Sequence, residues 1–221
     1  MDDPAKPDFV PALGRAEFTN SYDKVIAVMT RERCWRAQLL SLVAPAPGEA
    51  ILDVGCGTGT FAVMLKTACP TARVTGIDPD EEVLDIARLK AAAAGVEIVW
   101  QRVMGDRLAS LIPDGSADKA VTSLVLHQCP LDMKSAILGA MHAALKHGGR
   151  LFIADYGEQR TLLMRLLFRQ VQQLDGFENT QPNADGALPG LIRQAGFADV
   201  TVVRSLPTPT GAIELITAAK A

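Results

Sequence analysis

The sequence predicts a single doubly wound α/β domain with a mostly parallel sheet, spanning residues 1–221. Two observations predict this fold class: short apolar runs alternate with helical patterns along most of the chain, and a glycine-rich turn follows the first run. The runs are apolar throughout rather than at every second residue, which is typical of parallel strands covered by helices on both faces. A chain of 221 residues is long enough for one large core of this kind.

An N-terminal helical arm or cap, residues 1–44, is expected before the alternation begins. Apolar residues recur with helical spacing over residues 15–43, and prolines and a glycine at 45–48 interrupt the pattern. Residues 1–10 contain aspartates and prolines but no apolar run, so they resemble neither a signal peptide nor a transit peptide.

Strand and helix patterns then alternate through the middle of the chain. Strands are expected over residues 50–54, 73–77, 96–101, 119–126 and 150–155, and helices over 60–69, between 79 and 95, and over 131–146. Pro70 ends the first helix, Glu81 and Glu82 stand at the positive end of the second, and Gly148 and Gly149 follow the third.

The alternation breaks after Asp155, and residues 156–195 are expected to form a substrate-lid insertion. About thirty residues separate Asp155 from the next helical pattern at 186–195, whereas a short connection takes about 2–6. Six apolar residues share one expected helical face: Leu162, Leu163, Leu166, Leu167, Val171 and Leu174. This face suits core packing, a dimer contact, a lid over an apolar substrate or an interfacial helix. Two late strands, 200–204 and 212–219, complete the sheet.

Composition narrows the function classes. The 22 basic and 25 acidic residues give a formal net charge of −3, which argues against a general electrostatic grip on nucleic acid. The four cysteines are scattered without a CxxC pair, as in a reduced cytoplasm. No apolar stretch approaches the ~20 residues of a membrane span. We expect a cytoplasmic protein, a monomer or homodimer, with a small-molecule substrate, no nucleic-acid partner, no integral membrane span and no metal site.

The most informative segment is ILDVGCGTGT, residues 51–60, in which an apolar strand leads through a glycine turn into a helix. Gly55, Gly57 and Gly59 remove side chains where the backbone turns tightly and approaches a ligand. A dinucleotide fingerprint would need glycine where Thr60 stands, and the G-K-[ST] ending of a phosphate-binding loop is absent. The segment therefore predicts a nucleoside site that does not require pyrophosphate.

Acidic residues follow the next two strands. Asp78 comes 25 residues after Asp53 and can accept hydrogen bonds from both hydroxyls of a ribose. Asp106 follows the third strand, where a short acceptor can reach an adenine amino group. Each has a structural alternative: Asp53 can cap the glycine turn, Asp78 can cap a helix, and Asp106 can belong to an ordinary turn. Taken together with the glycine turn, they favour an adenosine site.

With these residues in view, the chain resembles class I S-adenosylmethionine-dependent methyltransferases, in the small-molecule group that includes the ubiquinone/menaquinone biosynthesis methylases (the methyltransferase type 11 pattern). The matching motifs are ILDVGCGTGT, the acidic end of VTGIDPD, MGDRL, DKAVTSLVLHQ and GGRLFIAD, which together cover roughly residues 50–155. The resemblance implies S-adenosylmethionine as cofactor, S-adenosylhomocysteine as product, and a Rossmann-like seven-stranded sheet whose final strand is antiparallel.

The resemblance also implies which residues contact the cofactor: Tyr22, Asp53, Gly55, Cys56, Gly57, Asp78, Pro79, Asp106, Arg107, Ser123 and Leu124. The glycines would lie under the methionine portion and Asp53 would hold its amino end. Asp78 would bind the ribose hydroxyls, and Asp106 with the backbone of Arg107 would face the adenine.

Three residues at the ends of later strands are candidates for catalysis. His127 is a candidate general base, and Asp155 and Tyr156 are candidates for orienting a substrate hydroxyl or amine, although each can instead be structural. The acceptor is expected to be small and apolar or lipid-like, with its reacting O, N or C atom left open. The alternatives are a non-catalytic adenosylmethionine-binding module and an NAD-dependent oxidoreductase. A base-flipping nucleic-acid enzyme is disfavoured, because a different sequence, beginning at His127, stands where its Asn/Asp-Pro-Pro motif would be.

Overall fold

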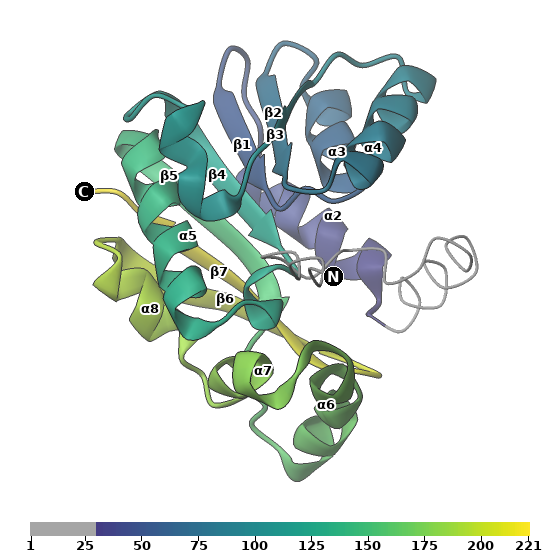
Figure 1. Ribbon diagram of the computed structural model, residues 1–221, viewed down its shortest axis with the longest axis vertical. Coiled ribbons are helices and arrows are strands. Elements are labelled where there is room, and N and C mark those ends of the chain that lie inside the picture. The colour runs from purple at the N-terminus through teal and green to yellow at the C-terminus, as the bar shows by residue number, and fades with distance from the viewer. Residues whose placement is uncertain (1–29) are drawn as a thin grey trace, which may run out of the picture.

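A computed structural model describes residues 30–221, so Tyr22 and most of the expected N-terminal arm lie outside the described residues. The described chain forms one seven-stranded sheet in the order β3-β2-β1-β4-β5-β7-β6, with helices packed around it (Figure 1). The predicted doubly wound α/β class is confirmed.

The strands are β1 (Ala50–Val54), β2 (Arg73–Asp78), β3 (Val99–Arg102), β4 (Ala117–Ser123), β5 (Leu145–Tyr156), β6 (Ala198–Thr208) and β7 (Gly211–Ala219). The first five pair in parallel, and β7 runs antiparallel to both β5 and β6, so the expected antiparallel final strand is confirmed. The strand order reverses between β1 and β4. Connections leave in opposite directions at such a switch point, which opens a crevice at the carboxyl ends of the strands.

The helices are α2 (Glu32–Val43), α3 (Thr60–Ala68), α4 (Glu81–Ala93), α5 (Leu131–Ala144), α6 (Leu162–Asp175), α7 (Phe177–Ala184) and α8 (Leu188–Gln194), with short 3-10 turns η2 (Gly105–Ser110) and η3 (Leu126–Gln128). In Figure 1, α6 and α7 lie together at the lower end of the view, with α6 beside the end of the β6–β7 hairpin. All of these helices except α7 were expected. The sequence of α7, FENTQPNA, is polar and contains Pro182, so it carries no helical hydrophobic pattern.

Both faces of the central strands of the sheet are buried, whereas the edge strands β3 and β6 are largely exposed or half-buried. In β5, Leu151 and Ile153 join a core cluster with α5 and α8, whereas Phe152 and Ala154 join a second cluster with α2, α3 and α6. Successive side chains of a strand point to opposite faces, so a strand covered on both sides must be apolar at every position. This packing explains why the central strands read as continuous apolar runs.

The expected apolar face of α6 is only partly a packing face. Of its six residues only Val171 is buried, and the side chains that α6 buries with it are Phe168 and Gln172. Four of the leucines are exposed: Leu162, Leu163, Leu166 and Leu174. Helical spacing placed these residues near one another, but it did not say which part of the helix surface meets the sheet. Within residues 30–221, no helix combines the length and apolarity needed to cross a membrane.

Candidate active site

A cavity of about 400 Å³ opens at the carboxyl ends of β1, β2 and β4, at the switch point of the sheet. Seven of the predicted cofactor residues line it: Gly55, Cys56, Gly57, Asp78, Pro79, Ser123 and Leu124. The turns after β1, β2, β3 and β4 and helix α5 all contribute to its wall. The fold thus brings together residues from segments that are distant in sequence, as their positions after successive strands predict.

The glycine turn is held tightly and leaves its outer surface open. The backbone N–H groups of Gly55 and Cys56 donate to the Ile77 carbonyl oxygen at 2.8 and 2.9 Å. Gly55 has φ +70°, and a Cβ there would lie 2.3 Å from Cγ2 of Val125 in the turn after β4. Gly57 has φ +51°, and its missing Cβ would meet nothing within 4 Å. Glycine is therefore required by conformation and by a close approach at Gly55, and Gly57 exposes bare backbone to the cavity.

Asp78 joins the glycine turn to the cavity. Its Oδ2 accepts from the Gly57 N–H at 2.8 Å and its Oδ1 accepts from the Asp80 N–H at 3.0 Å. Asp80, and not Asp78, caps helix α4, because Oδ1 of Asp80 accepts from Glu82 N–H at the start of that helix. Burial raises the pKa of Asp78, with the two backbone donors acting against it. The carboxylate oxygens keep unused lone pairs that suit the hydroxyl pair of a ribose.

Arg36 lines the cavity, and Asp53, which interacts with it electrostatically, is buried next to the cavity rather than in its wall. Asp53 is buried, and neither carboxylate oxygen has a well-aligned hydrogen-bond partner among the described residues. Burial raises the pKa of Asp53 to about 7, although Arg36 opposes that shift. Arg36 lines the cavity, pairs with Glu32, and leaves its Nε without a partner within the described chain. A buried polar atom without a partner is costly. These two side chains suit a ligand that brings one positive and one negative group, such as an α-amino acid.

Asp106 and Arg107 lie beside the cavity rather than in its wall. Both belong to η2, and the neighbouring Met104 and Gly105 are the residues that line the cavity. Oδ1 of Asp106 is buried with no partner among the described residues, so it remains free to accept from an amino group. Their contact with adenine stays a prediction.

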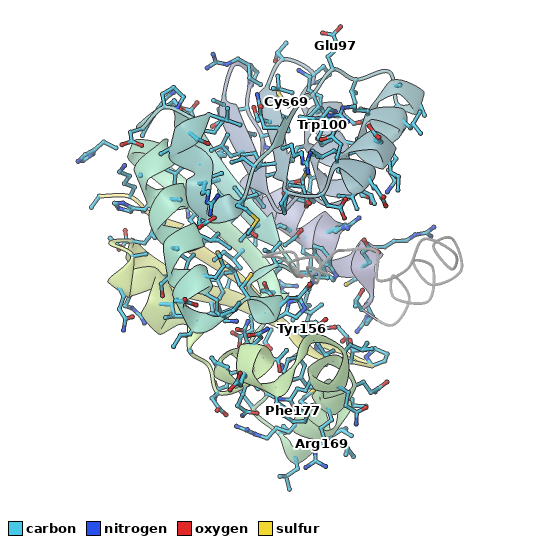
Figure 2. The ribbon with its side chains drawn as sticks, in the orientation of Figure 1. Cys69, Glu97, Trp100, Tyr156, Arg169 and Phe177 are labelled. Atoms are coloured by element: carbon cyan, nitrogen blue, oxygen red, sulfur yellow. The ribbon has the colours of Figure 1, made fainter. Side chains whose placement is uncertain are left out.

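His127, Asp155 and Tyr156 lie behind the cavity wall, and all three are buried. Nδ1 of His127 lies 2.7 Å from Oδ1 of Asp155, and Nε2 lies 3.4 Å from Oδ2 of Asp175. Burial lowers the pKa of His127, but the two carboxylates outweigh it and raise the pKa to about 9. Figure 2 shows Tyr156 at the junction between the sheet and the α6–α7 region. Catalytic roles for these residues stay predictions, and at neutral pH a protonated His127 has no lone pair with which to act as a base.

Sequence reasoning did not single out several residues that the structure brings to the site. Arg36 lines the cavity from α2, Asn179 lines it from α7, and Met133 lines it from α5. Lys134 is fully buried beside them. Arg36 and Lys134 had a weak signal, since each is a basic residue within an apolar helical pattern. No signal marked Asn179, because α7 itself was not recognised.

The described residues hold no group of three or more His, Cys, Asp or Glu side chains arranged to bind a metal ion. The unpartnered oxygens of Asp53 and Asp106, the free lone pairs of Asp78 and the open surface at Gly57 fit the amino, adenine and ribose parts of one adenosylated amino acid. The fold and this site have the arrangement that the resemblance to class I S-adenosylmethionine-dependent methyltransferases implies.

Comparison with known proteins agrees with this class. A family profile described as a methyltransferase domain matches residues 51–149. The chain is 38% identical over 122 residues to a demethylmenaquinone methyltransferase of Thermus thermophilus, which covers 55% of this chain and 54% of that protein. It is 30% identical over 138 residues to the demethylmenaquinone methyltransferase of Listeria monocytogenes, covering 61% and 57%. The chain thus matches little more than half the length of these relatives.

Two solved structures share the fold. A possible histamine N-methyltransferase of Thermotoga maritima superposes with a TM-score of 0.67 at 24% identity, covering 92% of this chain and 96% of that one. The magnesium protoporphyrin IX methyltransferase of Synechocystis PCC 6803 superposes with a TM-score of 0.69 at 18% identity, covering 88% and 85%.

Proposed function

We propose that this protein transfers the methyl group of S-adenosylmethionine to a small, apolar or lipid-like acceptor. The observation that carries the proposal is that a single cavity has both polar and apolar lining. Gly57 and Asp78 contribute polar groups to the lining, and Val103, Met133 and Ile137 contribute apolar side chains. A pocket of this kind orients a ligand through a few polar groups and binds the rest by burying apolar surface.

The relatives support an apolar acceptor. Their names describe methylation of demethylmenaquinone, and a similar quinone-like acceptor would suit this cavity. The family profile ends at residue 149, so α6, α7 and α8 lie outside the matched part. These helices are the part of the chain in which we expect the acceptor specificity to reside.

The chain's own residues act mainly by binding and alignment. When bound, the cofactor supplies a methyl group on a positively charged sulfur. Asp78 would hold the ribose hydroxyls, and Asp53 and Arg36 would hold the amino and carboxylate groups of the methionine part. These anchors would fix the direction of the methyl group, and the apolar lining would exclude water from it. In-line transfer gains most from this positioning, so no catalytic triad is required.

The free thiols and the net charge support a cytoplasmic protein without a nucleic-acid partner. Cys34, Cys56, Cys69 and Cys129 are all free thiols, which supports a cytoplasmic location. The formal charge of −3 supports a protein that works without a nucleic-acid partner, as a monomer or homodimer.

Calorimetry tests the cofactor, and product analysis tests the reaction. We expect S-adenosylhomocysteine to bind the purified protein and NAD to give no heat of binding. With S-adenosylmethionine and a panel of quinols, phenols and amines, we expect mass spectrometry to detect a methylated apolar product. Binding without turnover on any acceptor would favour the non-catalytic module, and NAD binding alone would favour the oxidoreductase.

A further inference from the structure

The turn after β4, residues 124–130, forms a wall between the cavity and the α6–α7 helices. Leu124, Val125 and Gln128 of this turn line the cavity. Asn179 of α7, which also lines the cavity, donates from Nδ2 to the Gln128 carbonyl oxygen at 2.9 Å. The position of α6 and α7 is therefore connected to the cavity by direct contacts with this turn.

Two buried side chains, Lys134 and His127, connect α6 and α7 to this turn. Nζ of Lys134 donates to the carbonyl oxygens of Leu126, Cys129 and Asn179, at 2.5, 2.8 and 2.7 Å. His127 reaches the last residue of α6, Asp175, through Nε2. Figure 2 shows the α6–α7 region extending from Tyr156 to Phe177 and Arg169, away from the sheet.

Asp155 on β5 anchors the turn after β4 to the sheet through hydrogen bonds. Its Oδ2 accepts from the backbone N–H groups of Val125 and Leu126 at 3.1 and 2.7 Å, and its Oδ1 accepts from its neighbour, Tyr156 N–H, at 2.8 Å. Leu124 at the start of the same turn has φ 54°, a strained conformation for a branched side chain. Asp155 thus holds the turn in place, and because it is completely buried its charge needs a nearby cation.

Asp175 needs a cation for a different reason. It stands at the C-terminal end of α6, where the helix dipole is negative, and the last turn of α6 contains no basic residue. A carboxylate there is unfavourable unless a positive group faces it. His127 lies between the two carboxylates and is the residue that can serve both of them.

We propose that His127 is a positioning residue that bridges Asp155 on β5 and Asp175 on α6 as a protonated imidazolium. In this role it holds α6 and α7 against the cavity wall and keeps Asn179 at the cavity. It replaces the general-base role expected from sequence. The inference uses the proposed function only for its activity readout, since the bridge itself concerns how the helices are held.

The pH dependence has a definite sign. The pKa of His127 is raised to about 9, above its unfolded value near 6.5, so the bridge is fully present below about pH 6.5 and is lost as pH rises through about 9. Tyr156 and Cys129, which are close by, remain neutral in that window because burial raises their pKa values to about 12 and 11. Burial lowers the pKa of Lys134, so its links to α7 also weaken with rising pH.

Trypsin cleavage of α6 measures how firmly the helix is held. Arg165 and Arg169 are exposed on α6, and cleavage within a helix requires local opening, so the rate follows the open population. We expect Asp175→Asn to raise the cleavage rate about fivefold to tenfold at pH 7.5, the low end for a charge-assisted contact. The matched control is Glu178→Gln, an exposed carboxylate of α7 for which the structure records no ion pair. We expect it to leave the rate unchanged.

Activity against pH separates the bridge from a base. We expect methyl transfer to fall as pH rises through about 9, and Asp175→Asn to lower the acceptor kcat/KM at pH 7.5 with little change in the affinity for S-adenosylhomocysteine. His127→Gln should remove most of the fall in the rate of methyl transfer with rising pH. The remaining fall would come from deprotonation of Lys134. The base role predicts the opposite, a rate that rises with pH and is maintained or increased in Asp175→Asn.

The cleavage rates test the bridging role of His127 directly. Equal cleavage rates for wild type and Asp175→Asn would overturn that role, even if the His127→Gln variant fails to fold. Absence of turnover with every acceptor would count against the proposed function alone, because faster cleavage of Asp175→Asn would still support the bridge.

Discussion

Asp78 offers the sharpest test of how the site holds its cofactor. Its carboxylate lines the cavity while accepting from the N–H groups of Gly57 and Asp80. Replacement by asparagine keeps the size of the side chain but removes its charge and one acceptor. Loss of one or two charge-assisted hydrogen bonds to the ribose should weaken S-adenosylhomocysteine binding by about 1–3 kcal/mol, which is about 5- to 150-fold in Kd.

Because Asp78 also holds the glycine turn through Gly57 N–H, a comparison of two ligands separates the loss of the ribose contact from a change in the turn. Calorimetry would measure wild type and Asp78→Asn with S-adenosylhomocysteine and with its 2′,3′-dideoxy analogue. We expect the substitution to weaken the first ligand strongly and the second little. Asp80→Asn is the matched control, since it removes a neighbouring carboxylate that caps α4. Equal losses for both ligands would refute the placement of the ribose at Asp78.

Three further predictions concern the same cavity. Arg36→Ala should weaken S-adenosylhomocysteine about tenfold by calorimetry while leaving adenosine unaffected, because adenosine has no carboxylate for the arginine to bind; equal weakening of both would contradict that assignment. Gly55→Ala should lower the free energy of unfolding by about 1–3 kcal/mol in urea titrations, since its Cβ would meet Val125 at a positive φ; unchanged stability would show that the turn can relax. Asp53 has a raised pKa of about 7, so it binds a proton that the unfolded chain has already lost near pH 4. Stability should therefore fall as pH rises from about 4 to 7, and S-adenosylhomocysteine should bind more tightly as pH rises through 7 and Asp53 ionises. Asp53→Asn should make both trends shallower than in wild type, and what remains of the stability trend reports other carboxyls whose pKa burial raises, such as Asp78. Trends as steep as in wild type would assign them to another group.

Much of the fold could be predicted because the informative patterns are local. The strand, glycine turn and helix over residues 51–60 follow from continuous apolar character, from three glycines and from the start of a helical pattern, and β1 and α3 begin at the expected residues. The predicted fold class is likewise confirmed, and residues 51–149 match a profile described as a methyltransferase domain. Helix α7 was missed because a short polar helix with an internal proline is held by its contacts rather than by its composition.

The α/β class, the order of its elements and the residues at the ends of β1 and β2 that are expected to contact the cofactor could therefore be predicted from the sequence alone. These depend on periodicity and on turns of a few residues, which short segments encode. The tertiary structure decided which surface of α6 is buried, that Arg36 reaches the cavity, and that His127 lies between Asp155 and Asp175. Such contacts join segments from different elements, and the charge state of His127 depends on both carboxylates and on burial. No local pattern contains that information, because it exists only when the chain has packed.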